Sequence, residues 1–93
     1  MENNESLSNV YKKLIKKYGD KQLIVAIEEL SELQKELCKA LRGKPNKENI
    51  VEEMADVLIM LDQVKIYFKI EDDEIRDIIE QKIKRTKERL LNG

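Results

Sequence analysis

The strongest helix breaker in this sequence is one segment, GKPN at residues 43–46, and it restricts the possible folds more than any other feature. The chain of 93 residues has one proline and three glycines, and most of its other residues favour helices. Leucine, isoleucine and valine recur at helical spacing on both sides of the breaker, and no strand-like alternation competes. Two long helices should therefore fold back as an antiparallel hairpin. We expect an all-α fold with four helices in a single domain, residues 1–93.

Apolar spacing and capping residues predict the limits of the four helices. The predicted helices cover residues 7–18, 21–42, 47–69 and 73–91. The residues expected to cap or stop them are Ser6 or Ser8, Gly19, Asp20 and Gly43, and the last helix is expected to start after Asp72. The last helix has acids at its start and bases near its end, as the helix dipole favours.

Composition narrows the possible partners and the compartment. Lysine and arginine total 18 and aspartate and glutamate total 19, so the net charge argues against stable non-specific binding of nucleic acid. The single cysteine, Cys38, cannot form an intramolecular disulfide, which favours a reducing cytoplasm. The N-terminal segment lacks the apolar part of a signal peptide, and the longest apolar run, VLIML, is too short to span a bilayer. We therefore expect a cytoplasmic protein that binds no membrane.

Two similar acidic motifs lie on either side of the breaker, EELSE before it and EEMAD after it. In an antiparallel hairpin the two motifs should face each other at a similar height. The carboxylates expected to meet there are Glu29, Glu32, Glu53 and Asp56. On the second predicted helix the apolar stripe is centred on Leu30, which places Glu29 at the border of the core and Glu32 further out.

The second motif adjoins the most apolar segment of the chain. Residues 57–61 are apolar on every side of a helix, so this segment should be buried on every side. A bare carboxylate at Asp56, or one turn earlier at Glu53, would there carry a large desolvation cost or take up a proton. A divalent cation would relieve the repulsion among all four carboxylates. Because the chain has no histidine, the ligands suit Mg²⁺ or Mn²⁺, allow Ca²⁺, and argue against zinc and di-iron sites.

An ordinary solvated surface is the alternative explanation of these motifs. Glutamates three and four residues apart on a lysine-rich helix usually face water and form salt bridges. Against this, the motif occurs twice at the same phase on adjacent helices, and its second copy adjoins the segment expected to be buried.

The paired motif resembles that of the all-α nucleoside triphosphate pyrophosphohydrolases, the MazG-like family that also includes dimeric dUTPases and dCTPases. The family pattern is ExxE, a spacer, then ExxD. Here it reads ELSE at residues 29–32, twenty intervening residues, and EMAD at residues 53–56. The resemblance covers about residues 20–90, and it implies a four-helix MazG-like bundle that assembles as a homo-oligomer.

The resemblance also implies an activity. This is the Mg²⁺-dependent hydrolysis of a (deoxy)nucleoside triphosphate between its α- and β-phosphates, with Mn²⁺ as a possible substitute, giving the nucleoside monophosphate and pyrophosphate. The metal ligands that the resemblance implies are Glu29, Glu32, Glu53 and Asp56. The catalytic residues that it implies are Glu28, Glu29 and Glu53, where Glu28 would orient the attacking water or support the ligands.

Basic residues provide candidate phosphate contacts. Many family members carry Lys-x3-Asn-x2-Arg on the last helix, where it helps to hold phosphates. Lys82 and Arg89 have this spacing, but Thr86 stands at the asparagine position, where a hydroxyl could still donate a hydrogen bond. Lys35 follows the first acidic motif and could also meet phosphates. The alternative for these basic residues is ordinary solvated surface charge.

A third helix that is apolar on every side cannot be covered by one short chain. We therefore expect a homodimer or homotetramer with this helix at its centre, in which the last helix could act on a neighbouring subunit. The alternative to an enzyme is a non-catalytic helical dimerisation or nucleotide-binding module that keeps the acidic metal site. The four aromatic residues do not identify a base.

Overall fold

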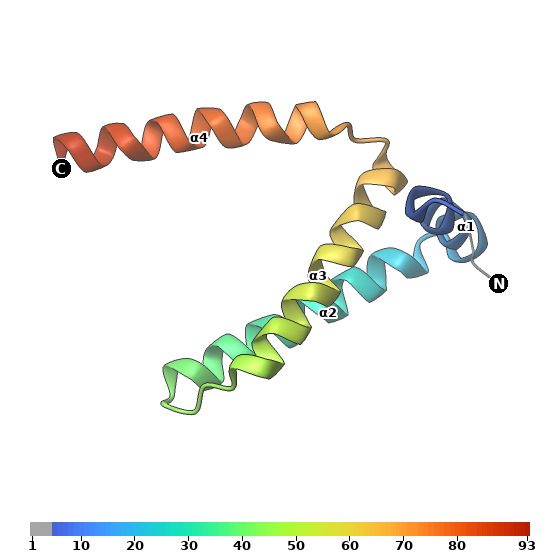
Figure 1. Cartoon of the computed structure of the whole chain (residues 1–93), viewed down its shortest axis with the longest axis horizontal. Helices are drawn as coiled ribbons and strands as arrows, with labels where there is room; N and C mark the ends of the chain where they lie inside the picture. The colour runs from blue at the N-terminus through green and yellow to red at the C-terminus, as the bar shows by residue number, and fades with distance from the viewer. Residues whose placement is uncertain (1–4) are drawn as a thin grey trace.

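The computed structural model describes residues 5–93, which form helices joined by short connections. The helices are α1 (Leu7–Tyr18), α2 (Lys21–Leu41), α3 (Lys47–Phe68) and α4 (Asp72–Asn92), and no strand occurs in this described part of the chain. α2 and α3 form an antiparallel hairpin, and α1 lies at the end where α2 begins and α3 ends (Figure 1). The all-α fold with four helices is thus confirmed, and each helix limit lies within one residue of its predicted position.

Local hydrogen bonds explain where α1 and α3 begin and where α1 ends. The Ser6 side chain accepts a hydrogen bond from the Asn9 backbone N–H at 3.2 Å, as expected of an N-cap. The Asn46 side chain accepts from the Asn49 N–H at 3.1 Å and caps α3 in the same way. Gly19 ends α1 with a φ of 55°, in a left-handed region that glycine enters without a side-chain clash.

Two aspartates near the predicted helix starts, Asp20 and Asp72, form side-chain contacts with α3. Asp20 has helical backbone angles, and its carboxylate accepts a hydrogen bond from the Tyr67 hydroxyl, which joins the start of α2 to the end of α3. Asp72 is the first residue of α4, and Glu71 before it takes the extended conformation of a cap. The Glu71 N–H donates to the Glu74 carboxylate at 2.7 Å. Asp20 thus holds the predicted N-cap position of α2 without the side-chain hydrogen bond of a cap, and α4 starts one residue earlier than predicted. In both cases a donor on α3 pairs with the aspartate side chain.

The interface between α2 and α3 contains polar residues among apolar ones. Its buried apolar residues are Ala26, Val57 and Met60. The Gln22 side-chain amide donates to the Gln63 side-chain oxygen at 2.7 Å, and Gln63 is only 3% exposed. A buried polar pair of this kind favours one alignment of two helices, because sliding one helix would leave both groups unpaired. This pair therefore sets the register of the hairpin.

Much of the apolar surface of the hairpin is uncovered within one chain. Leu30, the centre of the expected core stripe, is 47% exposed, and Ile27 is 63% exposed. On α3, Leu58 is 62% exposed, so one chain does not cover residues 57–61 on every side, and their burial by a second copy stays a prediction. The reason is geometric: Glu29 faces α3, which turns the next residue, Leu30, away by about 100°. In addition, α1 and α2 are the only described helices that pack on α3.

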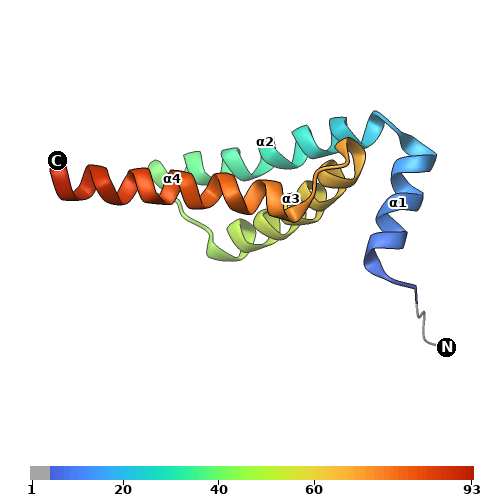
Figure 2. The ribbon, with the colours of Figure 1, turned by 90° about the horizontal axis from the view of Figure 1, so that it is seen from above.

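The last helix, α4, packs against no other helix in the described structure. Figure 1 shows α4 diverging from the hairpin at its first turn, and Figure 2 shows it running in the same general direction as the hairpin. Its four isoleucines, at 75, 78, 79 and 83, all remain exposed. Within one chain, α1, α2 and α3 pack together. A bundle that includes α4 would require α4 to pack against other helices, which it does not do in this structure.

Candidate metal centre

Three carboxylates meet between α2 and α3, those of Glu29, Glu53 and Asp56. One oxygen of each lies within 4.8 Å of the others, and all three residues are half-buried. Glu29 is seven residues after Gln22 on α2. Asp56 is seven residues before Gln63 on α3, so both carboxylates continue the stripe in which Gln22 and Gln63 are paired. Three of the four predicted ligands thus come together, one from the first motif and two from the second.

The electrostatics of this cluster favour a bound proton or cation. Burial raises the pKa of Glu29 above its ordinary value, and the charge of Asp56 and a hydrogen bond with it raise this pKa further. Burial also raises the pKa of Glu53, followed by the charges of Asp56 and Glu29. Each shift has the same cause, because a carboxylate that is partly removed from water and close to like charges is stabilised by a proton or a cation.

Glu53 gives the clearest structural sign of a ligand. Its Oε2 atom is buried and has no hydrogen-bond partner in the described structure. Buried carboxylate oxygens normally accept hydrogen bonds or bind metals. The cluster offers only oxygen ligands, which suit a hard cation such as Mg²⁺ or Mn²⁺ better than zinc. The residues present therefore fit a divalent cation held by Glu29, Glu53 and Asp56.

The other two acidic residues predicted for this site, Glu28 and Glu32, lie at its border. Glu32 is exposed and contributes no oxygen to the close cluster. Its charge nevertheless raises the pKa of Glu29 and of Glu53. Glu28 is also exposed, and its charge raises the pKa of Glu29. Both carboxylates are therefore near enough to act on the cluster electrostatically from its solvent side.

A buried glutamate in the same interface, Glu36, was not predicted. Glu36 is 6% exposed; its Oε2 pairs with Lys39 Nζ at 3.2 Å, while its Oε1 has no hydrogen-bond partner among the described residues. The signal is present in the sequence, because Glu36 follows Glu29 by seven residues and continues the stripe that faces α3. It was missed because the stripe of α2 was centred on Leu30.

The basic residues expected to meet phosphates are exposed, and two of them lie on α4, apart from the hairpin. Lys35 is exposed on α2. Lys82 and Arg89, with Arg85 and Thr86, line a hollow of about 240 Å³ on α4. The Thr86 hydroxyl donates to the Lys82 backbone carbonyl at 2.9 Å, so its proton is engaged within the helix. The single chain therefore does not place α4 against the carboxylates.

Across residues 5–93, no helix combines the length and the apolar character that a membrane span requires. Comparison of the chain with protein-family models, with curated proteins and with solved structures found no match. The family resemblance carried by the paired acidic motif therefore stays a prediction, and the arrangement of the carboxylates is the structural basis for assigning a function.

Proposed function

We propose that this chain is a Mg²⁺-dependent nucleoside triphosphate pyrophosphohydrolase of the MazG-like type. It would convert a (deoxy)nucleoside triphosphate to the monophosphate and pyrophosphate. The observation that carries this proposal is the half-buried cluster of Glu29, Glu53 and Asp56, in which one oxygen of Glu53 is buried without a hydrogen-bond partner among the described residues. A site made only of carboxylates suits the metal ions that assist phosphate chemistry. Mn²⁺ prefers similar ligands and should replace Mg²⁺.

Each acidic side chain has a role in the proposed reaction. Glu29, Glu53 and Asp56 would hold the cation, and Glu32 would add a carboxylate from the solvent side. When bound, the cation would stabilise charge on the phosphates. Glu28, which is exposed beside Glu29, would accept a proton from the attacking water. The residues proposed to bind phosphate oxygens are Lys35, Lys82 and Arg89.

We further propose that the chain works as a homo-oligomer, because one copy exposes too much surface. Its accessible surface is 8018 Å², whereas a compact monomer of 11.0 kDa exposes about 5,600 Å². Its radius of gyration is 17.0 Å, against about 12 Å for a compact chain of this length. An apolar groove along the hairpin is open, and its lining includes Ile27, Leu30, Val57 and Leu61. A second copy would cover this groove and could bring its α4 to the carboxylates.

Release of pyrophosphate tests the proposed activity. The protein should release it from at least one member of a panel of NTPs and dNTPs in Mg²⁺ or Mn²⁺, and from none in EDTA. Glu53→Gln should lower kcat at least about 100-fold, because it removes a charged oxygen ligand of the metal. Glu48→Gln, at an exposed position on the same helix, is the matched control and should remain active. Full activity of Glu53→Gln, or no release from any nucleotide, would contradict the proposal.

The second candidate function is a non-catalytic helical dimerisation or nucleotide-binding module that keeps the acidic site. The observation in its favour is that Lys82 and Arg89 lie on a helix that does not pack against the hairpin, while the Thr86 proton is engaged within that helix. Titration calorimetry separates the two functions. Mg²⁺-dependent binding of nucleotides without release of pyrophosphate would identify the module.

A further inference from the structure

The direction of α4 depends on a short connection, residues 69–71, which we call the elbow. Because α4 packs against no other helix in the described structure, no interhelical packing supports its direction. Lys69 ends α3 in the left-handed conformation with a φ of 56°, and Glu71 precedes α4 with an extended backbone. A helix of 21 residues is about 30 Å long, so a turn of about 20° at the elbow displaces its far end by about 10 Å.

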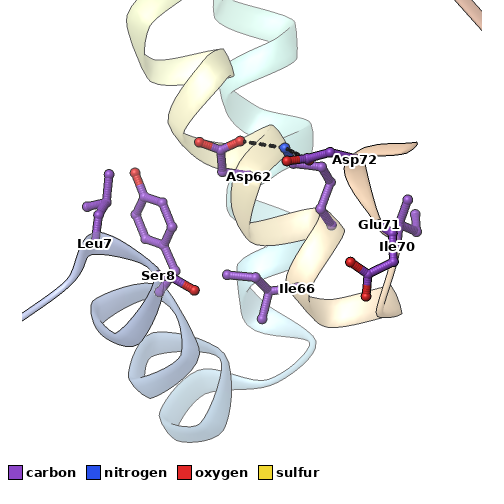
Figure 3. A pocket seen from close by; sticks show the side chains of 9 residues that line it. Leu7, Ser8, Asp62, Ile66, Ile70, Glu71 and Asp72 are labelled. Atoms are coloured by element: carbon purple, nitrogen blue, oxygen red, sulfur yellow. Dashed lines mark hydrogen bonds and ion pairs between the residues drawn. The ribbon is translucent and has the colours of Figure 1, made fainter. Parts of the chain in front are cut away.

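Lys65 joins the two sides of the elbow through its ammonium group. Its Nζ lies 2.8 Å from Oδ1 of Asp72, the first residue of α4, and 3.0 Å from Oδ1 of Asp62 on α3 (Figure 3). Within residues 5–93, no second ion pair joins α4 to another helix. The hydrogen bond from Lys65 holds the pKa of Asp72 below its ordinary value, and the bonds to Asp72 and Asp62 hold the pKa of Lys65 above its own.

Lys65 is the more buried member of this contact, because the side chain of its partner Asp72 is 70% exposed. The Lys65 side chain is 29% exposed, and it lies beside a hollow of about 310 Å³ between α1, α3 and the elbow (Figure 3). The apolar residues that line this hollow are Leu7, Tyr11, Ile66 and Ile70. Partial burial reduces screening of the ammonium by water. The Lys65 backbone also contacts the elbow, because its carbonyl accepts a hydrogen bond from the Ile70 N–H at 2.8 Å.

We infer that Lys65 is a positioning residue, which sets the direction of α4 by holding Asp72 beside Asp62. The consequence for catalysis rests on the proposed function: the direction of α4 would decide where Lys82 and Arg89 meet phosphates. Lys65 acts here through α4 and not by touching the nucleotide. Because exposed ion pairs contribute little to folding, losing this pair should alter the direction of α4 and leave the helices intact.

A distance between two spin labels measures that direction. Cys38 on α2 is exposed and is the single cysteine of the chain, and Lys87→Cys adds a second labelling site on α4. Labelled protein is diluted with unlabelled protein, so that only distances within one chain are counted. We expect a narrow distance distribution in this doubly labelled parent and a broader or shifted one in Lys65→Met. Lys65→Arg should keep the parent distribution, because a guanidinium can pair with both aspartates.

Two further variants make the test specific. Asp72→Asn removes the ion pair from the side of α4 at an exposed position, and it should act like Lys65→Met. Arg76→Met is the matched control, because Arg76 pairs with Asp73 at 3.2 Å inside α4 and does not cross the elbow. Circular dichroism should show the same helix content in all variants. The inference is wrong if Lys65→Met and Asp72→Asn both keep the parent distribution, or if Arg76→Met changes it equally.

The measurement needs neither a nucleotide nor a metal ion, so its outcome is independent of the proposed hydrolysis. A chain that releases no pyrophosphate can still confirm the role of Lys65. Conversely, an active enzyme in which the distances do not respond to Lys65→Met and Asp72→Asn contradicts this role and leaves the proposed function intact.

Discussion

Glu53 is a residue whose burial is unfavourable for folding and whose carboxylate is central to the proposed chemistry. Burial and the nearby charges of Asp56 and Glu29 raise its pKa, and its Oε2 has no hydrogen-bond partner in the described structure. Such a carboxylate is unfavourable in the folded chain when ionised, because folding removes part of its hydration. A cation that binds only the folded state would offset this cost and stabilise the protein by mass action.

The stability of the protein should therefore depend on pH and Mg²⁺ together. A carboxyl whose pKa is raised by folding binds more protons when folded, so its contribution to the free energy of unfolding falls as pH rises. For Glu29 and Glu53 this fall begins near their ordinary value of 4.5 and is complete above their raised pKa values in the folded chain. Mg²⁺ binds the ionised form and should raise Tm more at pH 7 than at pH 4.5.

Thermal denaturation at both pH values, with and without Mg²⁺, measures this effect. Glu53→Gln should lose most of the increase in Tm that Mg²⁺ causes at pH 7, whereas Glu48→Gln should keep it. An equal increase in Tm at pH 4.5 and pH 7 would show that Mg²⁺ acts outside the carboxylate cluster.

At the scale of the helices, the register of the hairpin places the carboxylates of α2 and α3 opposite each other. The hydrogen bond between Gln22 and Gln63 and the meeting of Glu29 with Asp56 are separated by seven residues on each helix, which is about two turns. Two helices that meet through apolar residues alone can slide at little cost, whereas a buried polar pair penalises sliding. The glutamine pair therefore supports the arrangement of the carboxylates without belonging to the candidate metal centre.

Removal of one glutamine tests this role. Gln63→Leu should lower the free energy of unfolding by about 1–3 kcal/mol, because it leaves the amide of Gln22 without its partner. The double variant Gln22→Leu/Gln63→Leu should regain most of this loss, yet bind Mg²⁺ more weakly than the parent because its register is less well defined. Urea denaturation and Mg²⁺ titration provide the two measurements. Parent-like Mg²⁺ affinity in the double variant would contradict the role in register.

At the scale of the whole molecule, one chain is extended and leaves apolar surface open. Its accessible surface exceeds that of a compact monomer by about 2,400 Å², which is more than the area that a protein–protein interface of standard size buries. The exposed apolar side chains lie on both long helices of the hairpin and along α4. Large exposed apolar patches are typical of interfaces.

Light scattering coupled to size-exclusion chromatography should show a dimer or tetramer at micromolar concentration. Leu58→Glu should weaken assembly at least about 100-fold in Kd, because it places a charge in the apolar surface that a second copy would cover. Leu58 is 62% exposed, so this change should leave the hairpin itself intact. Lys44→Gln, in the hairpin loop, makes the same change in net charge and should assemble normally. A monomeric parent protein would contradict this prediction.

Local signals explain how much of this molecule could be predicted from residues alone. The helix limits follow from side chains within a few residues of each end, such as Ser6 capping α1 and Gly19 ending it. The grouping of Glu29 with Glu53 and Asp56 could also be predicted, because motif spacing and one short loop place the two acidic turns at the same height. These predictions required no knowledge of what covers each helix.

Long-range packing decides which face of each helix is buried, and this could not be predicted from residues alone. α2 carries two usable faces, an apolar stripe around Leu30 and a more polar stripe of Gln22, Glu29 and Glu36, and periodicity alone favoured the first. Pairing with Gln63 on α3 selects the second, which buries Glu36 and leaves Leu30 exposed. The chain sequence therefore determines the helices and the acidic motifs, since these depend on near neighbours. The faces that become buried depend on partners distant in sequence, and these faces are settled when the helices pack. The direction of α4 depends instead on the backbone of the elbow and on the contact of Lys65 with Asp72.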